Sequence, residues 1–597
     1  MILKRVLVTT NRREGASPPT TVTEVGSGTV PNTVRPALIV SAVAVAAFLP
    51  VVFFGIPNGA DLFNHYRFAL PFYDSIRSGV FYPGWLAESN NGLGDPRFRF
   101  YPPGLYYLLV AARALFGDWY VGSITCLILL SVLAGLGVYF WARMFFEPKL
   151  AMWAGIFFTI APYHLNQIYQ ASLLSEYAAC AVLPFAFAFV ERVCQRRRTY
   201  DIAGLAASYA LLLLTHLPLA VVGSLSMGCY AVLRLDRKTA MSTLGRLALG
   251  VFLGLVASAF FWTTMVAELP WIKGNSHQPN TYYDYRLNFV FSPTALANRN
   301  TWYANILTLA LLGFFLPAIV LVRRRLKQDH SGLLAVALLF LATLLMTTPL
   351  SRPIWAIVPK LSEVQFPWRW LSITSMAGSI LLAACLPLWR KKLNTLRPRD
   401  VAIVFVFVLS LGFTVNDVVR ESDYLPRARF QPLLQEIRGA VSFKDWLPIW
   451  AHEFLQTEKM NGQVEAGTRV VTVNAWESQR RLFHIEAGPA GVAHVRTYFY
   501  PHWVATEGGR SFNTSPAADG TILVSVPERA ADIAIEFREP PRVRVAAIVS
   551  AVGALGIVGL AIFGWRRRSR TLPAFQVDGP SGSTKLFLNP IRSEVNS

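Results

Sequence analysis

The chain has 597 residues, of which 53% are hydrophobic and 15% charged, and its mean hydropathy is +0.39. The core of a soluble globular protein cannot bury this much apolar material, so the composition excludes a purely soluble protein. The formal net charge of +21 would suit nucleic acid, but Lys and Arg recur in short clusters between apolar runs rather than on one segment. We therefore expect an integral membrane protein without a nucleic-acid partner.

A helix that crosses a bilayer needs about 20 apolar residues. We read residues 1–35, which are rich in Ser, Thr, Pro and Gly, as a disordered cytosolic tail before an uncleaved first crossing. About twelve candidate crossings follow, at 36–56, 119–141, 150–163, 174–191, 202–215, 217–233, 247–268, 303–322, 331–349, 369–389, 401–418 and 545–565. The sequence thus predicts a polytopic α-helical membrane protein.

Basic clusters fall in every second gap between these runs, among them 323–327 and 390–392. The positive-inside rule makes those gaps cytosolic, which predicts a multi-pass membrane protein with both termini in the cytosol. The run 101–117 does not fit this alternation as a crossing, so we expect an interfacial or re-entrant helix. The run 202–233 must cross twice, with a turn at His216.

A second unit is expected outside the membrane, at 419–544. Short alternating segments in its later part, separated by Gly, Pro and Asn, predict a small antiparallel β-sandwich. These segments are 469–473, 481–485, 491–500, 521–526 and 532–537. The predicted organisation is therefore a transmembrane domain at 36–418 with an outer loop at 57–118, the β-rich unit, a last crossing at 545–565 and a cytosolic tail at 566–597.

The interiors of the predicted crossings contain no Asp, Glu, Lys, Arg or His. Ion-coupled transporters place such residues near the midplane, so we expect chemistry at the outer surface instead. Asp61 follows the first crossing in the polar segment 58–103, with His65 and Arg67 close behind it. A carboxylate at a membrane boundary suits a general base, because low polarity raises its pKa. The alternative is an interfacial helix with a solvated polar face, in which Asp61 caps the helix.

Two further outer segments carry candidate groups. Glu176 begins the crossing at 174–191, where a carboxylate that only snorkels or caps the helix is an equally good interpretation. Arg369 stands between two tryptophans, close to Glu363. Tryptophan is common at membrane boundaries, but a guanidinium held there also suits a phosphate head group. The spacing of Asp61 and His65 alone does not predict a metal site, because further ligands of suitable spacing are lacking.

Several motifs together resemble a known family. They are Gly59-Ala60-Asp61-Leu62-Phe63-Asn64-His65-Tyr66, Tyr82-Pro83-Gly84-Trp85, Asn91-Gly92-Leu93-Gly94, Phe100-Tyr101-Pro102-Pro103, Ala161-Pro162-Tyr163, Ser175-Glu176-Tyr177, Phe366-Pro367-Trp368-Arg369 and Tyr500-Pro501-His502-Trp503. This set is similar to that of bacterial membrane proteins labelled 6-pyruvoyl-tetrahydropterin synthase-related. The synthase itself is a small zinc enzyme, and this sequence lacks a three-histidine zinc cluster. The layout also resembles the GT-C superfamily of polyprenyl-phosphate-dependent glycosyltransferases.

The resemblance implies roles for individual residues. Asp61 matches the catalytic aspartate of the first outer loop, and Glu176 is a looser match to a second acidic position where an aspartate is more usual. We expect both to be catalytic, with a divalent cation left open as a cofactor. The residues expected to bind substrate are His65, Arg67, Tyr101, Lys273, Glu363 and Arg369.

The function implied is transfer of a sugar from a polyprenyl phosphate to an envelope lipid, glycan or protein on the outer face. Asp61 would deprotonate the acceptor hydroxyl, and Arg369, helped by Lys273, would hold the donor phosphate. The alternative is a non-catalytic membrane protein that acts in polysaccharide or lipid transport or assembly.

Overall fold

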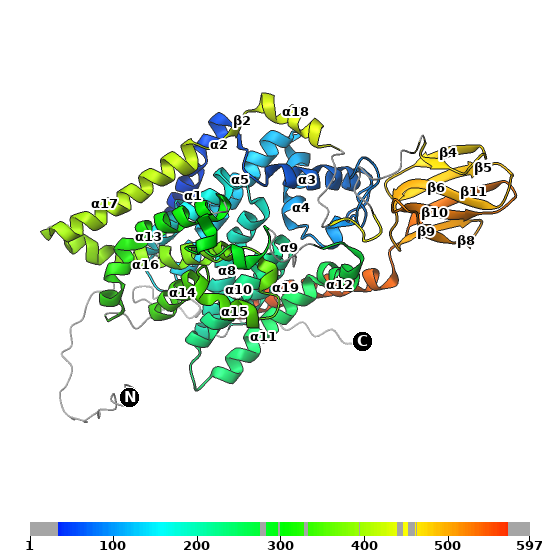
Figure 1. The fold of residues 1–597 in the computed structure, drawn as a ribbon. Helices are drawn as coiled ribbons and strands as arrows, with labels where there is room; N and C mark the ends of the chain where they lie inside the picture. Colours follow the sequence, from blue (N-terminus) through cyan, green and yellow to red (C-terminus); the bar gives the residue numbers. More distant parts are fainter. Residues whose placement is uncertain are drawn as a thin grey trace, which may run out of the picture.

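The computed structural model describes residues 34–196, 198–274, 282–296, 299–327, 332–392, 395–438, 446–451, 460 and 462–570. Most of these residues belong to one helical body, and the strands that follow it form a separate unit at one end (Figure 1). The helices are α1 (Val34–Ala47), α2 (Leu49–Phe54), α3 (Leu62–Arg77), α4 (Gly104–Phe116), α5 (Trp119–Ala142), α6 (Pro148–Thr159), α7 (Pro162–Tyr169), α8 (Leu174–Arg196), α9 (Thr199–Thr215), α10 (Leu217–Arg234), α11 (Ala240–Ala257), α12 (Ala259–Glu268), α13 (Arg299–Leu326), α14 (Leu333–Leu345), α15 (Arg352–Ile357), α16 (Leu371–Lys392), α17 (Pro398–Phe413), α18 (Arg427–Ile437) and α19 (Pro541–Arg570).

Nine helices among the described residues are long and apolar enough to cross a membrane. A tenth crossing results if α14 and the helical segment Pro349–Ile357, which is bent from it by 94°, count as one. Each of the twelve predicted runs overlaps a helix, so the prediction of a polytopic helical membrane protein is confirmed. The number of helices that could cross is smaller than the twelve predicted, because α6, with 12 residues, and α9, with 17, are shorter than one straight crossing needs.

The run 101–117 forms α4, which has 13 residues and is too short to cross as one helix. It ends at Gly117, whose φ of +66° is a left-handed conformation that glycine adopts at little cost. The next residue, Asp118, caps α5 by accepting a hydrogen bond from the Val121 N–H at 2.9 Å. These two signals separate α4 from the long helix that follows it.

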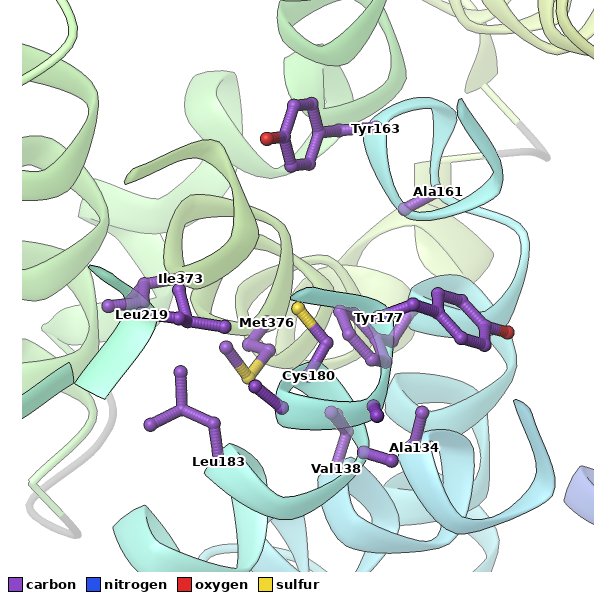
Figure 2. Close-up of a cluster of buried hydrophobic side chains, with 14 of the residues drawn as sticks. Ala134, Val138, Ala161, Tyr163, Tyr177, Cys180, Leu183, Leu219, Ile373 and Met376 are labelled. Atoms are coloured by element: carbon purple, nitrogen blue, oxygen red, sulfur yellow. The ribbon is translucent and has the colours of Figure 1, made fainter. Parts of the chain in front are cut away.

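The centre of the helical body is a cluster of apolar side chains from α5, α8, α10 and α16. Figure 2 shows Val138, Cys180, Leu183 and Met376 gathered in it, while Tyr163 from α7 stands at its edge. The helix α8 packs closely against both α5 and α9. The N-terminal turn of α8, which carries Glu176, is thereby fixed to the core.

The β-rich unit is built from two antiparallel sheets whose inner faces share one apolar core. One sheet has the order β3-β6-β10-β9 and the other the order β4-β5-β11-β7-β8. The strands are β3 (Val464–Glu465), β4 (Val471–Trp476), β5 (Arg480–Ile485), β6 (Gly491–Tyr498), β7 (Trp503–Glu507), β8 (Arg510–Phe512), β9 (Thr514–Pro516), β10 (Thr521–Val526) and β11 (Ala531–Phe537). All five predicted strand segments overlap these strands, which confirms a C-terminal β-rich unit.

The polar segment 58–103 joins the helical body to the β-rich unit. Its Trp85 is 1% exposed and lies in the core of the β-rich unit, with ring centroids 5.6 Å from both Trp503 and Phe537. Just before the segment, the short strand β1 (Ile56–Pro57) pairs with β2 (Tyr424–Leu425), which leads into α18. The C-terminal part of the chain therefore contacts the segment that carries Asp61 through Trp85, and it pairs with the residues just before that segment through β2.

A buried ionic cluster strengthens this junction. Glu268, at the end of α12, is fully buried and accepts hydrogen bonds from Tyr500 Oη at 2.6 Å, His502 Nε2 at 2.9 Å and Arg99 Nη1 at 3.1 Å. Arg542, at the start of α19, adds a further bond at 3.0 Å. Burial alone would raise the pKa of Glu268, but these donors and cations lower it to about 2.

Candidate active site

Two segments that are distant in sequence lie side by side at the candidate site. The Asp61 N–H donates to the Ala171 carbonyl at 3.0 Å, and the Gly59 N–H donates to the Ser172 hydroxyl at 2.9 Å. A Cβ at Gly59 would lie 2.6 Å from the backbone of residues 171 and 172, so only glycine permits this approach. The segment before α3 and the segment before α8 are thus fixed against each other by their backbones.

His65 adds a side-chain link between the same two segments. It is 5% exposed, its Nε2 accepts a hydrogen bond from the Leu174 N–H at 3.1 Å, and its Nδ1 lies 3.1 Å from the Tyr106 hydroxyl. Since Nε2 accepts, the proton of the neutral ring belongs on Nδ1, which donates to Tyr106. Burial lowers the pKa of His65 to about 3, which keeps the ring neutral. His65 therefore connects α3, α4 and the first residue of α8.

Asp61 precedes α3, and its carboxylate accepts no capping hydrogen bond from the backbone N–H groups of the first turn of that helix. It accepts one from Asn64 Nδ2 at 3.2 Å. Burial raises the pKa of Asp61, an effect that Asn64 and the nearby Arg369 oppose and that Glu176 increases. The side-chain cap that the alternative interpretation required is therefore absent, and the pKa of the carboxylate is shifted in the direction that favours proton uptake.

Glu176 and Arg369 form an ion pair next to Asp61. Glu176 is 2% exposed and accepts hydrogen bonds from Arg369 Nε at 3.2 Å, Tyr163 Oη at 3.0 Å and Gln167 Nε2 at 2.9 Å. Arg369 also donates from Nη1 to the Val364 carbonyl at 2.5 Å. Within the described parts of the chain its Nη2 group has no hydrogen-bond partner, and the side chain is 11% exposed. The Nη2 edge of a well-fixed guanidinium thus remains available to an anion.

Tyr101 and His216 complete the surroundings of this pair. Burial raises the pKa of Tyr101; Ser175 opposes this shift, and the Asp61 carboxylate adds to it. His216 lies at the break between α9 and α10, where its Nδ1 accepts from the Leu219 N–H at 3.2 Å. Burial and the charge of Arg369 lower the pKa of His216, so its neutral ring carries the proton on Nε2. The sequence predicts His216 at a turn on the outer side of the membrane; it does not predict that Arg369 lies close enough to shift the pKa of this histidine.

The remaining predicted residues lie elsewhere. Arg67 packs over the Phe63 ring at 4.9 Å, on the part of α3 that faces Arg97. Glu363 forms an ion pair with Lys360 at 2.6 Å. Lys273 is exposed, and its backbone N–H donates to Leu447 at the junction with the β-rich unit. The Arg67 and Lys273 side chains make no hydrogen bond or ion pair to Asp61 or Arg369 within the described residues.

The arrangement does not suit a divalent cation held by the protein. No group of three or more His, Cys, Asp or Glu side chains in the described chain is placed to bind a metal. Of the two neighbouring carboxylates, Glu176 is neutralised by Arg369 and its oxygens accept three other hydrogen bonds, from Tyr163, Gln167 and Ser372. That leaves Asp61 as a single carboxylate, which is fewer ligands than such ions take.

Comparison with solved structures gives weak similarities to glycosyltransferases. The chain is 17% identical to ArnT from Cupriavidus metallidurans bound to undecaprenyl phosphate, with a TM-score of 0.41 over 67% of this chain and 69% of that one. It is 15% identical to the arabinofuranosyltransferase AftD from Mycobacteria, with a TM-score of 0.41, over 64% of this chain but 26% of AftD. It is 12% identical to the oligosaccharyltransferase of Archaeoglobus fulgidus, with a TM-score of 0.37, over 69% of this chain and 56% of that one.

At these TM-scores the similarities assign no reaction or site residue to the chain. No curated protein matches the sequence. A family model does match: that of the 6-pyruvoyl-tetrahydropterin synthase related domain, described as a membrane protein, over residues 98–425. This match covers more than half of the chain and includes Glu176 and Arg369. The chain therefore belongs to the 6-pyruvoyl-tetrahydropterin synthase related family of membrane proteins.

Proposed function

We propose that this protein is a GT-C-like inverting glycosyltransferase that moves a sugar from a polyprenyl phosphate to an envelope lipid, glycan or protein. The observation that carries the proposal is the grouping of three side chains. Asp61 supplies a carboxylate of raised pKa, and Arg369 supplies a free guanidinium face that Glu176 holds in place. A base beside an anion-binding group is what transfer from a phosphate ester requires.

In the proposed step, the acceptor hydroxyl gives its proton to the Asp61 carboxylate while its oxygen attacks the anomeric carbon of the sugar. The bond from that carbon to the phosphate oxygen breaks, and the electron pair leaves with the polyprenyl phosphate. The phosphate gains negative charge as this bond breaks. The Nη2 group of Arg369 stabilises that charge more strongly in the transition state than in the bound donor.

Glu176 acts in this proposal as a positioning residue. Both of its oxygens are engaged by protein donors, so it orients Arg369 instead of meeting the substrate. His65 is likewise a positioning residue, because both of its ring nitrogens have protein partners. The site is proposed to face the periplasm of a bacterial inner membrane, where a lipid-anchored donor and an external acceptor can meet.

The test is transfer by the purified protein in lipid nanodiscs. Labelled undecaprenyl phosphate sugars are incubated with the protein and with envelope extracts from a strain that lacks it. Label that moves to an envelope product with wild-type protein, and not with Asp61→Asn, supports the proposal. Specific donor binding with no transfer to any fraction would instead favour the non-catalytic transport or assembly protein.

A further inference from the structure

Four aromatic rings pack together beside Arg369. Phe366 stacks on Trp368, with centroids 4.7 Å apart and an interplanar angle of 18°. Tyr282 and Tyr283, from the segment that follows α12, approach Phe366 at 5.2 Å and 6.2 Å. The Arg369 guanidinium lies over the Phe366 ring, 5.0 Å from its centroid. We call these four rings the aromatic platform.

A strained turn fixes the platform to Arg369. Gln365 has φ +67° and ψ −45°, and the Phe366 N–H donates to the Val364 carbonyl at 2.7 Å, so Gln365 is the centre of a γ-turn with positive φ. Residues with side chains rarely adopt this turn, which costs on the order of 1–3 kcal/mol. The same Val364 carbonyl accepts the bond from Arg369 Nη1. One strained turn therefore positions both the ring at the centre of the platform and the guanidinium.

The platform differs from scattered aromatics at a membrane boundary. Its inner ring, Phe366, is 9% exposed and is covered by its neighbours, whereas Tyr282 is 44% exposed. Rings from two separate segments therefore leave an accessible aromatic surface next to a cation. Sites of this kind, with apolar ring faces and a few polar groups, orient ligands that have both an apolar face and hydroxyls. A sugar ring has such a face, formed by its C–H bonds.

We propose that the aromatic platform binds the sugar ring of the donor while Arg369 binds its phosphate. This inference rests on the proposed function, which places the donor phosphate at Arg369. The sugar is joined to that phosphate through one oxygen, so the ring must lie within a few ångströms of the guanidinium. The platform adjoins Arg369 directly through Phe366, and Tyr282, which packs against Phe366, provides exposed aromatic surface.

The test compares binding of two probes to protein in nanodiscs. One probe is undecaprenyl phosphate, and the other is undecaprenyl phosphate linked to glucose, mannose or arabinose. Wild-type protein is expected to bind at least one sugar-bearing probe more tightly than undecaprenyl phosphate. Tyr282→Ala and Trp368→Ala should weaken that binding roughly 2- to 10-fold and leave binding of undecaprenyl phosphate unchanged. The exposed Phe81, changed to Ala, is the matched control and should alter neither.

Gln365→Gly provides a second variant that does not remove an aromatic ring. Glycine adopts positive φ without strain, so the melting temperature should be equal or higher. Because the turn is then free to relax, binding of the sugar-bearing probe should still weaken.

Three results would overturn the inference. In the first, no sugar-bearing probe binds wild-type protein more tightly than undecaprenyl phosphate. In the second, the platform variants weaken both probes equally, or neither. If Arg369→Lys still weakens both probes in that case, the platform inference fails while the proposed function stands. In the third, wild-type protein binds neither probe, and the proposed function fails together with the inference.

Discussion

The Leu174 backbone N–H donates a hydrogen bond to His65 Nε2 at 3.1 Å, in a buried contact between residues 109 positions apart. Asp61 lies four residues before this histidine, and Glu176 lies two residues after this amide. The bond therefore sets the spacing between the segments that carry the proposed base and the carboxylate that holds Arg369.

His65→Ala removes this link and leaves the buried Leu174 N–H without a partner, which costs about 1–3 kcal/mol. We expect a lower melting temperature and a lower kcat, with little change in donor Kd, since His65 contacts no substrate in this account. His65→Asn keeps one acceptor and should recover part of the stability. A His65→Ala protein with wild-type kcat would show that the link does not position Asp61.

Arg369→Lys keeps the charge but loses the fork of donors that joins Glu176, Val364 and the phosphate. Loss of a hydrogen bond to a charged group costs about 1.5–3 kcal/mol, so donor Kd should rise by roughly 10- to 150-fold in Lys and Ala variants. The exposed Arg429, changed to Lys, is the control. Unchanged donor affinity in a folded Arg369 variant would remove this residue from the phosphate site.

Glu268→Gln tests the junction between the helical body and the β-rich unit. Arg99 loses one of its two carboxylate partners and keeps Glu539 at 2.6 Å, so we expect a loss of about 1–3 kcal/mol from the hydrogen bonds that the buried donors around Glu268 no longer make in full. The pKa of Glu268 falls from its ordinary 4.5 to about 2 in the fold, so its stabilisation is complete above pH 4.5 and is lost as the pH falls towards 2. As the pH is lowered from 4.5 towards 2, the melting temperature of the wild type should fall, and that of Glu268→Gln should change less.

Glu507→Gln is the control for that experiment, since Glu507 pairs with Arg529 at the surface of the β-rich unit. Equal melting temperatures for wild type and Glu268→Gln at neutral pH would contradict the role of Glu268 at the junction.

The predicted topology follows from the basic clusters and remains to be measured. Phosphatase fused after Arg325 should be inactive, and phosphatase fused after Gln479 should be active, because the β-rich unit is predicted to lie outside. Activity at the first site, or none at the second, would contradict the orientation.

The helices and the later strands could be predicted because their signals are local. Apolar runs specify helices such as α5 and α16, and alternation specifies β5 and β11. The number of crossings was harder to predict from the sequence. The apolar run that contains the short helix α6 is interrupted at Pro162, which starts α7. Local hydropathy does not show whether such a pair crosses the membrane.

The site was predictable only in part. Asp61, Glu176 and Arg369 stand at the ends of apolar runs, so a common membrane surface could be inferred, but the ion pair that buries Glu176 depends on tertiary packing. The turn at Gln365 gave no signal, because glutamine has no preference for positive φ. Trp85 and Glu268 are buried at the junction by residues of the β-rich unit that are distant in sequence, so their burial had no local signal.

The central claim is that Asp61 removes the acceptor proton, and the rate of single-turnover transfer by Asp61→Asn tests it most directly. Asparagine keeps the size and the bond with Asn64 but cannot take a proton, so transfer should slow by about 10²- to 10⁴-fold with donor Kd unchanged. Burial raises the pKa of Asp61, so its charged form opposes folding at neutral pH, and the variant should melt at an equal or higher temperature. In the wild type, transfer should slow as the pH falls through this raised pKa. A folded Asp61→Asn protein that transfers sugar at the wild-type rate would contradict the account.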